Sequence, residues 1–294
     1  MQITSKELTF AYNEKAKFAR RALDGVTITV NEGDFFGIIG ETGSGKSTFI
    51  QHLNGLIPLQ SGELTVGEYN LVLPKKRRQK RLRIKSFKNL RRDVGMVFQY
   101  PEYQLFAETV FDDVAFGVKN FYPDATKQEI AEKVKKAIEL VGLNYSEVAA
   151  KSPFDLSGGQ KRRVAIAGVL AVEPKTLVLD EPVAGLDPVS KKRLMSLLHT
   201  LHDTGVVKTI IIVSHDMNDV MENCNRVAVF AGGKVVKTCE PKELFEDYSN
   251  DALARLGLPV TAYLTKTLSE VGVNVESDYK TEDFIESVTK KYFG

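Results

Sequence analysis

One nine-residue stretch decides the fold: Gly40-Glu41-Thr42-Gly43-Ser44-Gly45-Lys46-Ser47-Thr48. It follows an apolar run typical of a buried strand, Phe35 to Ile39, and opens a run with helical character, Ser47 to Leu53. Glycines allow the backbone to curl so that its N–H groups point inward, and the start of a helix adds partial positive charge. The stretch therefore predicts a polyphosphate-binding loop. A glycine turn beside a solvated lysine is the alternative.

The side chains at the end of this loop have expected roles of their own. We expect Lys46 to bridge the β and γ phosphates of a nucleotide and Thr48 to contact an α or β oxygen. The Ser47 hydroxyl is expected to hold Mg²⁺. The expected phosphate-binding residues of the loop are Gly40, Thr42, Gly43, Ser44, Gly45, Lys46, Ser47 and Thr48.

A pair of acids follows a second strand-like run. Asp180 and Glu181 come directly after the short, mostly apolar segment Thr176 to Leu179. We expect Asp180 to lie near Mg²⁺ through a water molecule, and Glu181 to polarise a water for in-line attack on the γ-phosphate. Acid pairs at strand ends are usually solvated caps, so this interpretation depends on the phosphate-binding loop.

The rest of the chain alternates short apolar runs with helical patterns. Helical spacing recurs from Ile130 to Val141, and Asp187-Pro188 places an N-cap before a proline at the start of a run that ends near Leu201. The alternation predicts a largely parallel sheet covered by helices. Pieces before residue 40 and from Glu63 to Leu73 lack intervening helices and are expected to form an antiparallel layer. The expected strands are Val26 to Val30, Phe35 to Ile39, Val94 to Phe98, Thr176 to Leu179, Thr209 to Val213 and Arg226 to Phe230.

A third motif stands between the phosphate-binding loop and the acid pair. Leu156-Ser157-Gly158-Gly159-Gln160 matches the signature of ATP-binding cassette (ABC) proteins without a mismatch, and it opens a helical run, Gly159 to Ala171. The chain thus resembles an ABC ATPase. In that family the signature closes over ATP held by the opposite subunit, so the resemblance implies a dimer in which Ser157, Gly158, Gly159 and Gln160 bind nucleotide.

The remaining elements of the family occur in order. Gln99 resembles the glutamine that reaches Mg²⁺ and the attacking water, and His215 resembles the switch histidine that contacts the γ-phosphate and orients Glu181. Asp187 ends a stretch that resembles the loop that crosses the dimer interface. Tyr12 stands where the family places a ring that stacks on adenine, although it could merely pack beside Phe10.

Finer features resemble the ATPases of energy-coupling factor transporters, which import vitamins and transition-metal ions in prokaryotes. They are Gln99-Tyr100-Pro101-Glu102-Tyr103-Gln104-Leu105-Phe106, the run from Leu156 to Gly168, and a helical segment after about Glu240. The context Asn54-Gly55-Leu56 favours the second of the two paralogous ATPases, often called A-prime. One departure is Val183, where the family commonly has Thr or Ser.

This resemblance implies partners. They are a paralogous ATPase, a transmembrane coupling protein that docks near Gln99 and Tyr100 to Phe106, and a small membrane protein that captures the substrate. Glu102 either receives a basic side chain from the coupling protein or is solvated. The cofactors implied are ATP and Mg²⁺, and the expected location is the cytoplasmic face of the cell membrane, as a peripheral subunit.

The expected fold class is α/β, a P-loop NTPase with a RecA-like parallel-sheet core. To this core the ABC resemblance adds an antiparallel β subdomain, an α-helical signature subdomain at about 101–172 and a small α-rich C-terminal domain. We expect the nucleotide-binding domain to span 1–238 and a dimerisation domain to span 239–294.

Composition sets further limits. The 294 residues carry a net charge of +2, but the segment Lys75 to Arg92 holds 11 of the 40 basic residues and no acid. The remaining 29 basic and 38 acidic residues give −9. The basic segment is either a solvated insertion or a contact with anionic lipid, and no nucleic acid is expected because its aromatic content is limited to Phe87. With two cysteines, no secretion signal and no apolar run of bilayer length, a reducing cytoplasm is expected.

Two further classes of protein compete with this interpretation. An ABC ATPase outside transport typically has two cassettes or a long coiled-coil insertion, and neither is present in the sequence. An ordinary phosphate-loop enzyme such as a kinase needs neither the signature nor His215. Within transport, the ATPase of another ABC transporter class is the nearest alternative.

Overall fold

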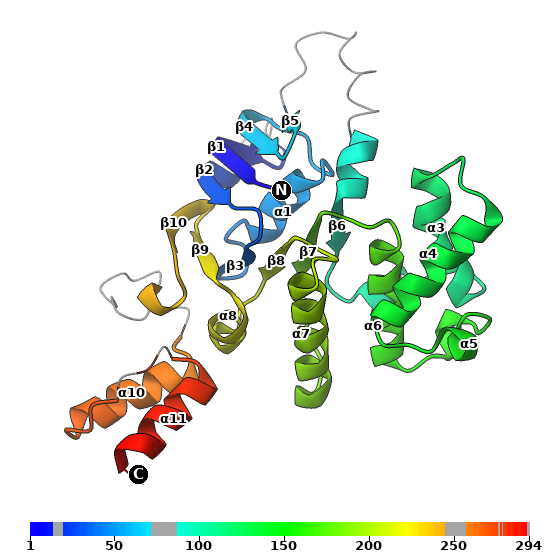
Figure 1. Ribbon diagram of the computed structural model, residues 1–294. Helices are drawn as coiled ribbons and strands as arrows, with labels where there is room; N and C mark the ends of the chain where they lie inside the picture. Colours follow the sequence, from blue (N-terminus) through cyan, green and yellow to red (C-terminus); the bar gives the residue numbers. More distant parts are fainter. Residues whose placement is uncertain (14–19, 72–86, 245–256, 276, 278, 293–294) are drawn as a thin grey trace.

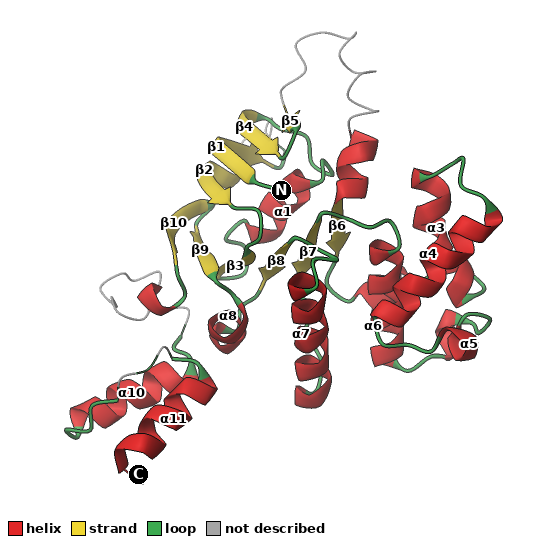
Figure 2. Cartoon of the chain, viewed as in Figure 1, coloured by secondary structure: helices red, strands yellow, loops and turns green. Residues whose placement is uncertain are grey.

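The computed structural model describes residues 1–13, 20–71, 87–244, 257–275, 277 and 279–292. Two sheets form its centre (Figures 1 and 2). The smaller sheet is antiparallel and has the order β2-β1-β4-β5. Its strands are β1 Ile3–Ala11, β2 Arg21–Val30, β4 Ser61–Val66 and β5 Tyr69–Leu71. The expected antiparallel layer is therefore confirmed, with β2 beginning five residues earlier than expected because Ala11 and Phe10 of β1 pair with its first residues.

The larger sheet has the order β10-β9-β3-β8-β7-β6, and all of its pairs are parallel except β10 with β9. All five of its parallel strands were expected from the sequence within one or two residues, whereas β10 was not. Their bounds are β3 Phe35–Gly40, β6 Val94–Val97, β7 Thr176–Asp180, β8 Thr209–Val213, β9 Arg226–Ala231 and β10 Lys234–Cys239.

Side chains alternate across this sheet and supply two separate cores. On β3, Phe36 and Ile38 pack toward the antiparallel sheet and the helix that follows the strand, α1 (Lys46–Leu53), whereas Phe35 and Ile39 pack into a second core. That core also holds helices α3 (Val110–Phe121), α4 (Lys127–Leu140), α6 (Gly158–Leu170) and α7 (Pro188–Asp203). Both faces are buried, which explains why the parallel strands are continuously apolar rather than alternating.

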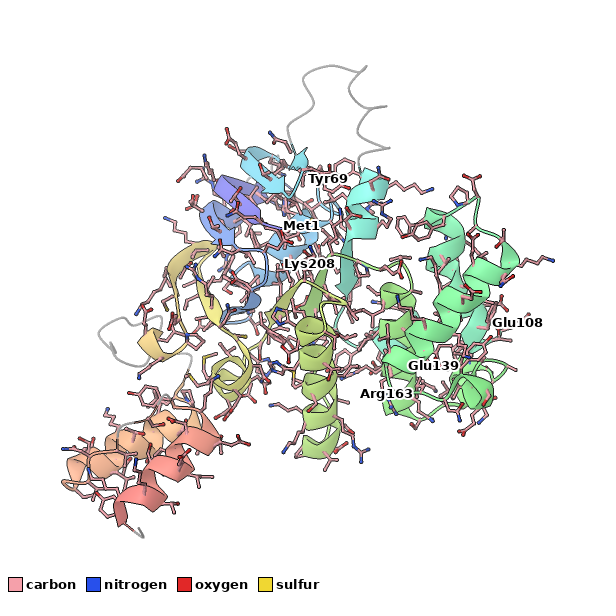
Figure 3. All side chains as sticks on the ribbon, viewed as in Figure 1. Met1, Tyr69, Glu108, Glu139, Arg163 and Lys208 are labelled. Carbon is pink, nitrogen blue, oxygen red and sulfur yellow. The ribbon has the colours of Figure 1, made fainter. Side chains whose placement is uncertain are left out.

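Helices cover the larger sheet and extend from one side of it. A cluster formed by α3, α4, α5 and α6 lies beside β6, and Figure 3 labels Glu139 on α4 and Arg163 on α6 within it. The bounds are α1 Lys46–Leu53, α3 Val110–Phe121, α4 Lys127–Leu140, α5 Tyr145–Val148, α6 Gly158–Leu170, α7 Pro188–Asp203 and α8 Met217–Asn223, with short 3-10 turns at Pro101–Gln104, Pro153–Asp155 and Lys242–Leu244.

Two further helices, α10 Val260–Glu270 and α11 Thr281–Tyr292, lie at the C-terminal end near α8 (Figure 1). The helical tail expected from the sequence is thus present in the described part, although most of the stretch expected from Ala252 to Leu258 lies outside it. The basic segment also falls largely outside the described residues, which resume at Phe87 in a helical stretch. Among the described residues, no helix has the length and apolar character needed to cross a bilayer.

Candidate nucleotide-binding site

The loop between β3 and α1 has a backbone that only glycine fits at two positions. Gly40 has φ of 150°, and a Cβ there would lie 2.2 Å from the carbonyl oxygen of Phe230. Gly45 has φ of 107°, and a Cβ there would lie 2.4 Å from the carbonyl oxygen of Ala22. The tight curl expected from the sequence therefore exists, with α1 beginning at Lys46 directly behind it.

Lys46 is held inside this curl. Its side chain is buried, and Nζ donates hydrogen bonds to the carbonyl oxygens of Gly40 at 2.6 Å and Glu41 at 2.9 Å. Burial lowers the pKa of Lys46, and the nearby carboxylates of Glu181 and Asp180 oppose this shift. A desolvated ammonium group held by carbonyl oxygens is well placed to bind phosphate oxygens, which carry more negative charge.

A cavity of about 600 Å³ opens in front of the loop. Tyr12 lies at one side of it, with its hydroxyl 3.3 Å from Oγ1 of Thr48 and its ring edge-on to Phe10 at a centroid distance of 4.9 Å. The Tyr12 side chain is 50% exposed. A half-exposed ring beside the phosphate loop offers a stacking surface for a base, while Phe10 supports it from behind. Residues lining the cavity are Tyr12, Asn13, Arg20, Arg21, Ala22, Thr42, Gly43, Gly45, Lys46, Ser47, Thr48, Gln99 and Glu181.

Four residues that line the cavity were not expected from the sequence. Asn13, Arg20, Arg21 and Ala22 line the cavity beside Tyr12. Arg21 is engaged by Asp24 at 2.6 Å. Arg20, directly before β2, and Arg21, its first residue, were the available signal, but nothing in the sequence placed them opposite the loop, because their position depends on how β1 and β2 pair.

The acidic residues arrive at the cavity from the end of β7. Burial raises the pKa of Asp180, and a hydrogen bond with the Ser47 side chain and the charge of Lys46 counteract this effect. A partly desolvated carboxylate joined to a serine hydroxyl fits a magnesium ion, which prefers oxygen ligands. The described residues contain no group of three or more His, Cys, Asp and Glu side chains suited to a metal. Asp180 and Ser47 supply two oxygen ligands, so phosphate oxygens and water would complete the shell of an ion bound there.

Glu181, Gln99 and His215 come together at the carboxyl ends of neighbouring strands. Nε2 of Gln99 donates a hydrogen bond of 2.9 Å to Oε2 of Glu181, and Nδ1 of His215 lies 3.5 Å from Oε1 of the same carboxylate. The strand order explains the meeting, because β7 lies between β6 and β8. Glu181 and Tyr100 have φ of 47° and 55°, in the left-handed region. Such strained backbone is concentrated at functional sites.

The signature residues lie elsewhere. Ser157 caps the N-terminus of α6 by accepting a hydrogen bond from the backbone N–H of Gln160 at 3.3 Å, and the Gln160 side chain accepts one from the N–H of Ser157 at 3.0 Å. Ser157, Gly158 and Gly159 are exposed. None of the expected signature residues lines the cavity formed by the described part of the chain. The start of α6 therefore presents an exposed anion-binding terminus away from the loop of its own chain.

Asp187 is also outside the cavity. Its side chain caps α7 by accepting hydrogen bonds from the backbone N–H groups of Val189 and Ser190, both at 3.0 Å. The N-cap expected at Asp187-Pro188 is confirmed. The role of Asp187 in nucleotide binding stays a prediction.

Glu102 has a partner in its own chain. Arg162 of α6 donates two hydrogen bonds to the Glu102 carboxylate, at 3.0 and 2.9 Å, and two more from Nη1 to the carbonyl oxygens of Pro182 and Ala184, both at 3.0 Å. The expectation of a solvated Glu102 is therefore wrong, whereas a contact with the coupling protein stays a prediction. No local pattern indicates the pairing with Arg162, because the two residues are 60 positions apart.

Comparisons with known proteins agree with this geometry. The sequence profile of the ABC transporter family matches residues 23–184. Similar curated proteins include the "Energy-coupling factor transporter ATP-binding protein EcfA2" of Clostridium tetani, 42% identical over 96% of this chain and 93% of that protein, and that of Clostridioides difficile, 44% identical over 96% of this chain and 94% of that protein.

Solved structures give the same result. CbiO1 from Clostridium perfringens, described as part of the ABC transporter complex cbiONQ, matches with a TM-score of 0.72 and 34% identity over 90% of this chain and 98% of its own. The ATP-binding cassette MJ0796, solved as a dimer in a post-hydrolysis state bound to ADP and Pi, matches with a TM-score of 0.69 and 27% identity over 81% of this chain and 98% of its own.

Proposed function

Because the chain belongs to the ABC transporter family and, within it, to the ATP-binding proteins of energy-coupling factor transporters, we propose that it powers an importer by closing on a homologous ATPase when ATP binds and opening after hydrolysis. The chain is an ATP-binding and ATP-hydrolysing subunit. The observation that carries the mechanism is that Gln99 and His215 each contact one oxygen of the Glu181 carboxylate. This carboxylate lines the same cavity as the phosphate-binding loop.

The residues of this chain divide the chemistry among them. Backbone N–H groups of the loop and the Lys46 ammonium bind and orient the β and γ phosphates. Glu181 accepts a proton from the attacking water, and Gln99 and His215 fix the direction in which its carboxylate points. Ser47, Asp180 and Gln99 would hold Mg²⁺. The ion bound there would supply positive charge to offset the charge that develops on the phosphate oxygens.

A second subunit is needed to complete the site. The signature at the start of α6 is exposed and remote from the cavity of its own chain, which supports a role against nucleotide held by a partner. The dimeric structures of MJ0796 are consistent with such pairing. We infer that Ser157, Gly158, Gly159 and Gln160 contact the partner's nucleotide, and that the partner is a paralogue.

An exposed aromatic surface next to Gln99 supports docking of a transmembrane coupling protein. Tyr100, Tyr103, Phe106 and Phe116 are exposed, and the rings of Phe106 and Phe116 meet edge-on at 5.0 Å. Because this surface follows Gln99 directly in the chain, a helix seated on it would sense whether Gln99 is engaged with Glu181. Arg162 already neutralises Glu102, so the docking helix binds here through apolar contacts.

The remaining parts of the proposal concern the assembly. Residues 239–294 form a dimerisation domain, a role supported by exposed apolar side chains on α10 and α11, including Tyr263, Leu264 and Ile285. The protein acts as a peripheral subunit at the cytoplasmic face of the membrane. The transported vitamin or metal ion is captured by a separate small membrane protein.

Isolation of the intact assembly tests this function. The full-length chain, tagged and purified from detergent-solubilised membranes, should carry a homologous ATPase and two integral membrane proteins identifiable by mass spectrometry. The assembly should release phosphate from ATP, and a matched assembly with Lys46→Ala should bind less nucleotide, because the site formed by the loop of this chain is lost. Copurification of ribosomes or DNA in place of membrane proteins would favour an ABC protein outside transport. Membrane proteins of a different architecture would favour another ABC transporter class.

A further inference from the structure

Helix α8 begins immediately after the switch histidine. Asp216, the residue that follows His215, caps α8 by accepting hydrogen bonds from the backbone N–H of Asn218 at 2.9 Å and from its side-chain amide at 3.0 Å. The imidazole of His215 is 70% exposed, and within the described residues its ring contacts Glu181. Since neighbouring side chains hardly enclose the ring, its position depends on the backbone from Ser214 to Asp216.

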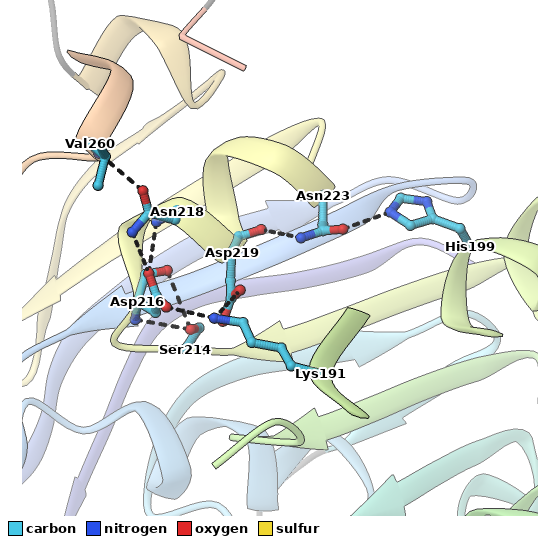
Figure 4. A network of polar contacts seen from close by, with 8 residues as sticks. All are labelled: Lys191, His199, Ser214, Asp216, Asn218, Asp219, Asn223 and Val260. Atoms are coloured by element: carbon cyan, nitrogen blue, oxygen red, sulfur yellow. Dashed lines mark hydrogen bonds and ion pairs between the residues drawn. The ribbon is translucent and has the colours of Figure 1, made fainter. Parts of the chain in front are cut away.

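A single lysine fastens that backbone to the neighbouring helix. Nζ of Lys191, one turn into α7, lies 2.7 Å from Oδ2 of Asp216 and 2.7 Å from Oδ1 of Asp219 (Figure 4). Asp219 is only 6% exposed, and its other carboxylate oxygen has no hydrogen-bond partner among the described residues. Removal of the Lys191 charge would therefore leave a buried carboxylate without its cation, which favours a shift of α8 toward water.

The other end of α8 is tied to α7 as well. Nδ2 of Asn223 donates a hydrogen bond of 2.7 Å to the Asp219 carbonyl oxygen, and Oδ1 of Asn223 lies 2.9 Å from Nε2 of His199. The His199 ring stacks on Phe35 of β3 with a centroid distance of 4.8 Å. Polar contacts thus join helices α7 and α8, and the N-cap of α7 is Asp187, in the segment that resembles the interface-crossing loop.

The two C-terminal helices are attached to this same unit. Oδ1 of Asn218 accepts a hydrogen bond of 3.0 Å from the backbone N–H of Val260, the first residue of α10. Oε1 of Glu222 accepts one of 2.7 Å from the backbone N–H of Thr281, the first residue of α11, and a second from the Thr281 hydroxyl. The N–H groups at the start of a helix lack partners within the helix. Helix α8 supplies an acceptor to the first N–H group of α10 and to that of α11.

We propose that Lys191 is a positioning residue for His215, and that α8 couples the position of the C-terminal helices to the position of this histidine. The proposal rests on the proposed function, because it concerns the same ATP site. Movement of the C-terminal helices on their dimer partner pulls on Asn218 and Glu222. Movement of α7 at the dimer interface pulls on Asp216 and Asp219 through Lys191. Both movements change the approach of His215 to Glu181.

Steady-state kinetics of the full-length chain in its purified assembly tests the lysine. Lys191→Met removes the charge and keeps much of the side-chain length, and it should lower kcat for ATP by about tenfold with KM changed less than about twofold. Lys191→Arg should restore most of kcat, and Lys192→Met, the exposed neighbour on α7, should match the parent. A role confined to stability would instead lower the melting temperature and the amount of active protein in Lys191→Met, with kcat per active site equal to that of the parent.

A second variant guards against failure to fold. Asp219→Asn keeps the shape of the side chain and removes the charge that Lys191 binds, so it should give the same selective loss of kcat.

The attachment of the C-terminal helices is tested by Glu222→Ala, which should lower kcat about threefold. The control is Glu286→Ala, which changes an exposed acid on α11 and should leave kcat unchanged. Equal kcat in Lys191→Met, Asp219→Asn and the parent would overturn the positioning role. Equal kcat in Glu222→Ala and Glu286→Ala would overturn the link to the C-terminal helices. A parent assembly that neither binds nor hydrolyses ATP would instead contradict the proposed function.

Discussion

The side-chain amide of Gln99 donates a hydrogen bond of 2.9 Å to the Glu181 carboxylate, although the two residues are 82 positions apart. They meet because Gln99 follows β6 and Glu181 follows β7, and these neighbouring parallel strands pair Val97 with Leu179. His215 approaches the second carboxylate oxygen. Glu181 is therefore oriented from both sides.

The half-exposed ring of Tyr12 provides a first prediction. Tyr12→Ala removes a stacking surface and should weaken ATP binding about tenfold, since stacking of a base on an aromatic ring is worth about 1–3 kcal/mol. Tyr12→Phe keeps the ring and loses only the hydroxyl contact with Thr48, so its affinity should stay near that of the parent. Titration with a fluorescent ATP analogue measures both. Equal weakening by the two substitutions would assign the effect to the hydroxyl and not to stacking.

The pair of Arg162 and Glu102 should contribute to stability. The Arg162 side chain is 5% exposed and that of Glu102 17%, and the arginine also satisfies two backbone carbonyl oxygens. Arg162→Met leaves these acceptors unpaired and should lower the free energy of unfolding by about 3 kcal/mol. Denaturant unfolding of the full chain measures it, with Lys161→Met on the same helix as the control. A loss no larger than that of the control would show that this pair does not hold the segment after Gln99 to α6.

The same pair makes stability depend on pH. Burial raises the pKa of Glu102, but the hydrogen bonds from Arg162 outweigh burial, and the net pKa lies below its ordinary value of 4.5. The unfolded chain therefore binds a proton at a higher pH than the native chain does. The stabilisation is present in full above pH 4.5 and is lost as the pH falls through the lowered native pKa. The parent should therefore lose unfolding free energy relative to the double variant Arg162→Met/Glu102→Leu as the pH falls into the acid range. A difference in unfolding free energy that is independent of pH would contradict this assignment.

Local patterns were sufficient to predict much of the fold. The phosphate loop, the acid pair and the parallel strands depend on short-range rules, namely glycine backbone freedom and runs of apolar β-branched residues, and all lie where expected. The strand β10 was not expected, because Lys234 to Cys239 alternates weakly and becomes a strand only by pairing with β9.

Contacts that join distant segments account for the rest of the site. Arg162 lies next to the signature in sequence, but nothing local indicates that its guanidinium reaches Glu102 or the carbonyl oxygen of Ala184. Lys191 likewise looks like an ordinary exposed helix residue until α8 packs beside it. Such pairings depend on tertiary packing that the pattern of a single sequence does not specify.

Glu181→Gln separates ATP hydrolysis from ATP-driven association of the subunits. The amide keeps the size of the side chain but cannot accept the proton of the attacking water, so phosphate release should fall at least about a hundredfold. ATP should still drive the association of subunits, because the phosphate-binding loop and the signature are unchanged. Phosphate release and ATP-dependent dimer formation are measured on the same preparation, with Glu286→Gln as the exposed control. We expect a stable ATP-bound dimer without turnover, and phosphate release at the rate of the parent would contradict the role of Glu181 as the proton acceptor.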